Sequence, residues 1–106
     1  MAKIDALFTY MIENNASDLH LSTGTKPKIR KHGELEELDQ PVLTNDHLRA
    51  LLFEIATEAQ QKIFLDRKDL DFAYEIPDVA RFRANYFEQK RGMGAVFRVI
   101  PTKILS

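Results

Sequence analysis

The sequence predicts an α+β fold in which an antiparallel sheet of about six strands is packed on one side by helices. Segments with helical spacing of apolar residues and segments with strict alternation follow in the order helix, three strands, two helices, three strands. Short turn signals separate successive strands, as is typical of antiparallel hairpins. Runs of strands that are separated from runs of helices indicate α+β rather than alternating α/β architecture.

Composition limits the classes of protein to consider. The 106 residues are the size of one domain, with 44% hydrophobic and 29% charged residues, which is typical of a compact globular chain. The net charge is −1, so no overall positive field favours a nucleic-acid partner, and any anion site must be local. Cysteine is absent, which excludes disulfides and thiolate sites. Residues 1–15 lack a long apolar segment, so we expect no signal peptide or membrane span and a cytoplasmic location.

The first two elements are predicted from their periodicity. Residues 4–12 form one apolar helical stripe that consists of Ile4, Leu7, Phe8, Met11 and Ile12. Residues 16–22 alternate instead, which predicts a half-buried strand. The inward face of this strand carries Leu19 and Leu21, and its outward face carries Asp18, His20 and Ser22.

Residues 27–38 predict a hairpin with His32 and Gly33 at its tip, because glycine supplies the positive φ of a tight turn. The register places lysines opposite glutamates, which is favourable. It also places the apolar Ile29 opposite the charged Glu36, a pairing that a regular hairpin does not explain. A bulge or a longer loop in this hairpin is the alternative.

Two consecutive helices are predicted next. Thr44 is placed to cap a helix that runs to Ile55, and Thr57 with Gln60 forms a capping-box pattern that begins a second helix.

The last third of the chain predicts a strand followed by a long hairpin. Residues 69–76 alternate, with Leu70, Phe72, Tyr74 and Ile76 facing inward. Residues 79–100 form the hairpin, with Lys90 and Arg91 at the centre of its turn. Burial of Phe82 and Ala84 together with Phe97 and Val99 fixes the parity of the register.

This register sets Arg83 opposite Arg98 on the outer surface. Like charges that face each other across strands are destabilising, so the pairing needs an explanation. One interpretation is neutralisation in surface salt bridges by Glu75, Asp71 or Glu88. The other is an anion between the two guanidinium groups, because arginine forks onto phosphate oxygens.

Other candidate sites are weaker. The three histidines, His20, His32 and His47, have no metal-ligand spacing, and we interpret them as structural or solvated. Gly92 and Gly94 follow a turn without a third glycine or a helix, which favours a bulge over a dinucleotide loop. No GxxxxGK[ST] motif occurs.

Five short motifs carry a resemblance to a known family. They are ASDLHL, HGEL, DLDFAY, ARFRAN and VFRVIP, in this order along nearly the whole chain. The sequence resembles the N-terminal domain of the PilT family of type IV pilus retraction ATPases, in the secretion ATPase superfamily. The resemblance implies a PAS-like domain over residues 1–100 and, at 101–106, the start of a linker to a RecA-like ATPase domain that this sequence does not include.

The resemblance also implies a role for the arginines. In that superfamily two N-terminal-domain arginines, fifteen residues apart, reach the terminal phosphates of ATP, and Arg83 and Arg98 match both. Arg81 and Arg91 are implied as support for this site or for a subunit interface. The implied parent is a homohexamer that uses ATP and Mg²⁺, lies in the cytoplasm peripheral to the pilus machinery of the inner membrane, and packs this domain against RecA-like domains of its own and neighbouring subunits.

Because the chain ends before the Walker motifs of such a domain, we expect it to be inactive alone and to hold no cofactor by itself. The alternative is a free-standing PAS-like module that binds a ligand or partner, which requires polar groups that converge on an internal cavity.

Overall fold

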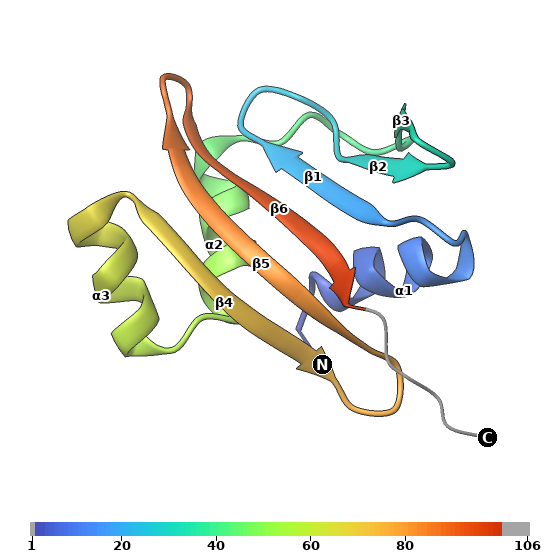
Figure 1. Ribbon diagram of the computed structural model, residues 1–106. Helices are drawn as coiled ribbons and strands as arrows, with labels where there is room; N and C mark the ends of the chain where they lie inside the picture. Colours follow the sequence, from blue (N-terminus) through green and yellow to red (C-terminus); the bar gives the residue numbers. More distant parts are fainter. Residues whose placement is uncertain (1, 101–106) are drawn as a thin grey trace.

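The computed structural model describes residues 2–100 and contains the predicted elements in the predicted order (Figure 1). These elements are α1 (Asp5–Glu13), β1 (Asp18–Ser22), β2 (Lys28–Lys31), β3 (Glu34–Glu37), α2 (Asn45–Glu54), α3 (Glu58–Arg67), β4 (Asp69–Ile76), β5 (Ala80–Gln89) and β6 (Gly92–Ile100). The α+β prediction is confirmed, and the predicted linker at 101–106 lies outside the described residues.

The six strands form one antiparallel sheet in the order β3-β2-β1-β6-β5-β4. Both predicted hairpin registers are confirmed, including Ala84 opposite Phe97 and Arg83 opposite Arg98. The sheet is completed by pairing of β1 with β6, which sets Leu19 opposite Phe97 and joins segments at opposite ends of the sequence. No turn signal marks this pairing, and the hairpin patterns alone did not predict it.

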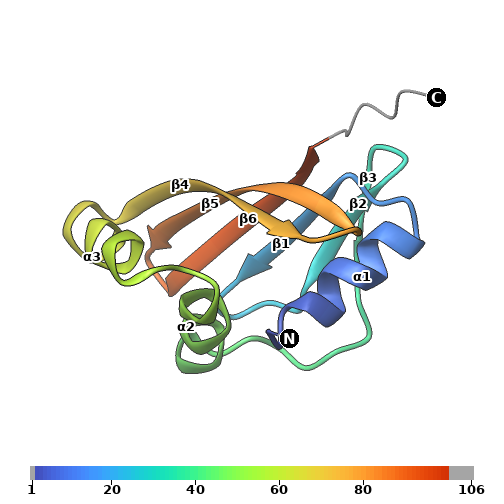
Figure 2. The same cartoon turned by 90° about the horizontal axis from the view of Figure 1, so that it is seen from below.

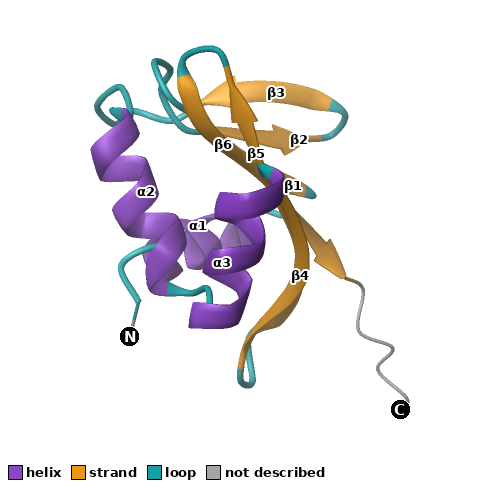
Figure 3. Ribbon diagram, turned by 90° about the vertical axis from the view of Figure 1, so that its left-hand side faces the viewer, coloured by secondary structure: helices purple, strands orange, loops and turns teal. Residues whose placement is uncertain are grey.

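Helices α2 and α3 begin at the predicted caps. The Thr44 hydroxyl accepts a hydrogen bond from the backbone N–H of His47 at 3.2 Å, and Thr57 and Gln60 form the complete capping box. Lys68 ends α3 in the left-handed conformation, with φ of 62°. The three helices of residues 2–100 lie on the same side of the sheet (Figures 2 and 3), so no helix in this part of the chain covers the opposite face, called the outer face here.

The core between helices and sheet is built from aromatic rings. Phe8 of α1 stacks on Phe82 with ring centroids 4.3 Å apart and meets Phe97 edge-on at 4.8 Å. Tyr86 is fully buried, and its hydroxyl donates to the backbone carbonyl of Leu52 at 2.7 Å. Phe72, predicted to face inward, is only half-buried because β4 is the edge strand of the sheet.

Two predicted irregularities do not occur. The strands β5 and β6 pair without interruption as far as Gln89 and Gly92, so the bulge expected at Gly92 and Gly94 is absent. Instead, Gly92 leaves room for the Asn45 side chain, whose Oδ1 atom would lie 2.5 Å from a Cβ at this position. The β2–β3 ladder is also regular. Glu36 opposite Ile29 is tolerated because β3 is an edge strand with every residue exposed.

Candidate functional site

The outer face carries one row of residues that crosses all six strands. Cross-strand pairing aligns Leu35, Arg30, Asp18, Arg98, Arg83 and Ala73, from β3 to β4. Directly opposed residues point to the same face, so this row gathers three arginines and one carboxylate on a surface without helices. The local charge of the row is therefore positive although the net charge of the chain is −1.

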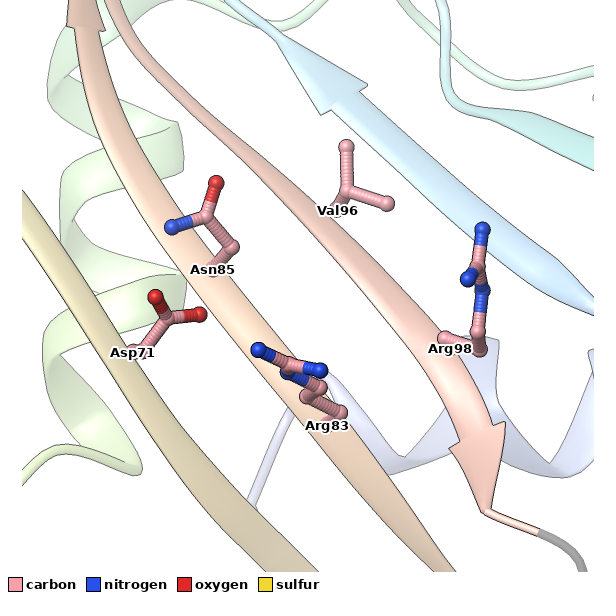
Figure 4. A pocket seen from close by; sticks show the side chains of 5 residues that line it. All are labelled: Asp71, Arg83, Asn85, Val96 and Arg98. Carbon is pink, nitrogen blue, oxygen red and sulfur yellow. The ribbon is translucent and has the colours of Figure 1, made fainter.

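An open hollow of about 450 Å³ lies over the β4, β5 and β6 part of this face. It is lined by Asp71, Arg83, Asn85, Val96 and Arg98. Figure 4 shows Arg83 lying along β5 toward Asn85 and Asp71, whereas Arg98 reaches over β1. The two arginines are thus neighbours by backbone, with guanidinium groups that diverge.

The divergence of Arg98 has a cause in β1. The Arg98 Nε and Nη2 atoms both donate to Oδ2 of Asp18, at 3.4 and 3.3 Å. The Asp18 side chain is 7% exposed and the Arg98 side chain 72% exposed, so the guanidinium group covers the carboxylate and keeps its other edge in solvent. Asp18 is a functional candidate that sequence reasoning missed, because its alignment with Arg98 depends on the β1–β6 pairing.

The three carboxylates named in the salt-bridge interpretation do not pair with Arg83 or Arg98 among residues 2–100. Glu75 pairs with Arg81, its direct cross-strand neighbour, with Nε 3.5 Å from Oε1. Glu88 makes no ion pair among residues 2–100, and neither does Asp71, which only lines the hollow. Within the same residues Arg83 has no carboxylate partner, so its guanidinium group is unneutralised.

The structure separates Arg91 from the other predicted arginines. Arg81 and Arg83 are two positions apart on the outward side of β5, whereas Arg91 lies in the hairpin turn, next to Gly24. Six strand residues, 84–89, separate Arg83 from this turn, a distance of roughly 20 Å. One bound phosphate group therefore cannot contact both Arg83 and Arg91.

His20 is the outer-face residue next to this row on β1, and it lies opposite Val96 and Lys28. Its Nε2 atom is buried without a hydrogen-bond partner among the described residues. Burial lowers the pKa of His20 below 6.5, against the opposing influence of Asp18. Within residues 2–100 no three His, Cys, Asp or Glu side chains gather as a metal site would require. None of the helices in this part of the chain is both long and apolar enough to cross a bilayer.

Comparison with known proteins identifies relatives over nearly the whole chain. The sequence is 44% identical over 103 residues to the type IV pilus retraction ATPase PilT of Pseudomonas aeruginosa, a match that covers 97% of this chain. It is 34% identical over 103 residues to a twitching motility protein of Neisseria gonorrhoeae, again over 97% of this chain. No protein-family model matches the chain.

The fold has the same relatives. The crystal structure of the pilus retraction motor PilT with bound ADP superimposes with a TM-score of 0.88 at 32% sequence identity, covering 99% of this chain. The chain spans only 30% and 27% of the two sequence relatives and 31% of that solved chain. The similarity therefore concerns one region of longer proteins.

Proposed function

The chain matches the N-terminal region of the PilT family of type IV pilus retraction ATPases in sequence and in fold, and from this premise we propose that it is the N-terminal domain of a hexameric pilus motor. In this proposal the domain contributes Arg83 and Arg98 to the phosphates of ATP and contributes surfaces between subunits. The motor retracts type IV pili and thereby drives twitching motility.

The adjacency of Arg83 and Arg98 is the observation that carries the proposal. They are separated by 98 − 83 = 15 residues and lie directly opposite each other at the edge of an open hollow. Like charges that face each other across strands are costly. Asp18 pairs with Arg98, whereas Arg83 has no carboxylate partner among residues 2–100. Two arginines on rigid strands suit the oxygens of a triphosphate, over which charge is spread.

A second domain is required for this function. We infer that residues 101–106 begin a linker to a RecA-like ATPase domain, which holds ATP and Mg²⁺ through its own motifs. The outer face, with no helix over it, then closes onto the phosphates held by a RecA-like domain of the same or a neighbouring subunit. Because Arg83 and Arg98 contact the phosphates only on closure, nucleotide state is coupled to a rigid-body movement of the domain.

The remaining assignments follow from the same proposal. Arg81, already paired with Glu75, supports the site, and Arg91 in the hairpin turn contributes to a subunit interface. The motor works in the cytoplasm against the pilus machinery of the inner membrane. The alternative of a free-standing module with a ligand in its core is disfavoured by the stacked Phe8, Phe82 and Phe97 rings, which fill the space between helix and sheet.

Substitution of each arginine in the full-length protein tests the proposal. Arg83→Ala and Arg98→Ala are each expected to lower steady-state ATP turnover, because each removes a charge-assisted contact to the phosphates. The expected loss is on the order of 2 to 4 kcal/mol, or about 30- to 1,000-fold. Lysine should restore only part of the rate, since it keeps the charge and loses the fork.

Thermal unfolding of the same variants separates function from folding. Arg83→Ala should change stability by no more than about 0.5 kcal/mol, as at other exposed positions. Arg98→Ala should cost about 1 kcal/mol because it uncovers Asp18. Arg67→Ala, in the exposed last turn of α3, is the matched control and should keep wild-type turnover. Wild-type turnover in both Arg83→Ala and Arg98→Ala would contradict the proposal.

A further inference from the structure

We infer that Asp18 is a positioning residue that orients Arg98 for phosphate binding, an inference that rests on the proposed function of Arg98. Asp18 lies in the ASDLHL segment of β1 and faces Arg98 across the β1–β6 pairing. It contacts no phosphate itself in this scheme and acts only through the guanidinium group of Arg98.

The N–H donors of Arg98 can serve Asp18 and a phosphate group at the same time. A guanidinium group has five N–H donors. Asp18 takes the Nε–H and one Nη2–H, both on the same oxygen, at 3.4 and 3.3 Å. The remaining Nη2–H and the two Nη1–H groups include the end-on fork, which can still bind two oxygens of a phosphate group. The Asp18 contact therefore fixes the direction of the side chain without using up its binding edge.

The difference in exposure supports this division. Asp18 is nearly buried while the Arg98 side chain is 72% exposed, so the carboxylate lies beneath the guanidinium group rather than beside it in solvent. A long exposed side chain on a flat sheet face otherwise samples many rotamers, and ordering it on binding costs free energy. An anchor at its inner edge removes part of that cost before the phosphate arrives.

Arg30 does not compete for this role. It lies opposite Asp18 on the other neighbouring strand, β2. Its Nη1 atom donates to the backbone carbonyl of Gly33 at 3.0 Å, which turns the side chain toward the β2–β3 hairpin tip. Among residues 2–100 the only ion pair of Asp18 is with Arg98.

Within the described part of the chain, residues 2–100, Arg83 has no such anchor. The residue on its β4 side is Ala73, which offers no polar group, and Figure 4 shows Arg83 lying along β5. Of the two arginines, Arg98 is thus held by a carboxylate, whereas Arg83 has no ion-pair partner among residues 2–100. The inference predicts that Asp18 influences Arg98 and has no independent influence on turnover.

Double-mutant analysis of ATP turnover in the full-length protein tests this dependence. Asp18→Asn keeps the size of the side chain and removes its charge, and we expect it to lower turnover about tenfold, as for other groups that orient a directly contacting residue. In the Arg98→Ala background the same substitution should have no further effect. Glu37→Gln, an exposed carboxylate opposite Lys28 on the outer face, is the matched control and should keep wild-type turnover.

Each alternative gives a different result. Turnover in Asp18→Asn could equal or exceed that of the wild type while Arg98→Ala is impaired. Asp18 would then only compete with phosphate for Arg98. This result would overturn the inference and leave the proposed function standing. A further drop in the double variant would also overturn it, because Asp18 would then act elsewhere. Wild-type turnover in Arg98→Ala would contradict both.

A measurement on the 106-residue chain tests the contact without ATP. The side-chain Nε–H signal of Arg98 in a nitrogen–proton NMR spectrum should be protected from exchange with solvent in the wild type and exchange rapidly in Asp18→Asn. Asp18→Glu, which keeps a carboxylate within reach, should retain the protection and lose less turnover than Asp18→Asn. If Asp18→Asn does not fold, Asp18→Glu decides the question. A shifted Arg98 signal in Asp18→Glu would show a changed contact, and unchanged turnover in the same variant would then overturn the inference.

Discussion

At the scale of single residues, an outer-face side chain in this sheet has two direct cross-strand neighbours on its own face. For Asp18 both neighbours are arginines, and for Arg83 they are Arg98 and the small Ala73. The same strand geometry thus buries a carboxylate in one place and, among residues 2–100, leaves a cation without an ion-pair partner in another. Whether a charged side chain on this face is buried and paired or left unpaired therefore depends on both of its cross-strand neighbours.

His20 shows how such neighbours affect stability. Burial lowers its pKa, and Asp18 opposes this, while Arg30, Lys28 and Arg98 lower the pKa further. The unfolded chain binds a proton near pH 6.5 and the folded chain only at lower pH. The free energy of unfolding should therefore be fully retained above about pH 6.5 and fall as the pH decreases through the folded pKa.

Urea denaturation at pH 7.5 and pH 5.5 measures this effect. The wild-type chain should lose more stability between the two pH values than His20→Gln, because the variant has no group to protonate at this position. Equal losses in both chains would show that burial of Nε2 does not disfavour the charged imidazole.

At the scale of elements, local patterns were sufficient for the registers of the two predicted hairpins and for the starts of α2 and α3. Alternation and turn residues predicted both hairpins with their registers, and the cap signals at Thr44 and Thr57 predicted both helix starts. The adjacency of Arg83 and Arg98 was predictable for the same reason, since it lies within one hairpin. Alternation assigns a residue to a face but does not choose a distant partner strand, so the Asp18 contact was not predictable.

Gly92, at the start of β6, is required by a contact with α2. The sequence pattern around it is also typical of a bulge and therefore did not reveal this contact. Gly92 has φ of +136°, and Oδ1 of Asn45, which accepts a hydrogen bond from the backbone N–H of Met93 at 3.0 Å, occupies the space beside it. The expected bulge was therefore wrong, and the close approach of α2 is the physical reason for the glycine.

Alanine substitution distinguishes this close approach from turn geometry alone. Gly92→Ala should destabilise the chain by about 2 to 4 kcal/mol, because it adds backbone strain and displaces the Asn45 side chain from its hydrogen bond. Gly33→Ala is the control: Gly33 also has positive φ, +81°, but among residues 2–100 no atom outside its two chain neighbours lies within 4 Å of an added Cβ. It should cost only about 1 kcal/mol. Chemical denaturation measures both, and equal costs would show that the Asn45 contact contributes nothing.

At the scale of the whole molecule, the sheet is asymmetric. One face is packed by three helices around aromatic rings, while the outer face holds the row of charges and an open hollow. A hollow that is open to solvent does not exclude water, and water screens its charges. In the proposed function this face is one half of a binding surface, and a second domain supplies the other half.

This asymmetry limits what the 106-residue chain should bind by itself. Exposed ion pairs contribute roughly 0.2 to 1 kcal/mol each, so Arg83 and Arg98 together supply at most about 2 kcal/mol toward ATP. A Kd of 1 mM requires about 4 kcal/mol. We therefore expect the isolated chain to bind ATP with a Kd above about 1 mM and to release no phosphate from it.

Calorimetric titration with ATP at physiological salt, together with a phosphate-release assay, checks this expectation on the folded chain. At 1 mM ATP a ligand this weak should stabilise the chain by no more than about 0.4 kcal/mol, so the thermal midpoint should hardly change. The full-length protein is the positive control, because in the proposed function its second domain supplies the missing contacts. Saturable micromolar binding by the isolated chain would instead favour the free-standing ligand-binding module, since surface charge on an open sheet face cannot supply that affinity.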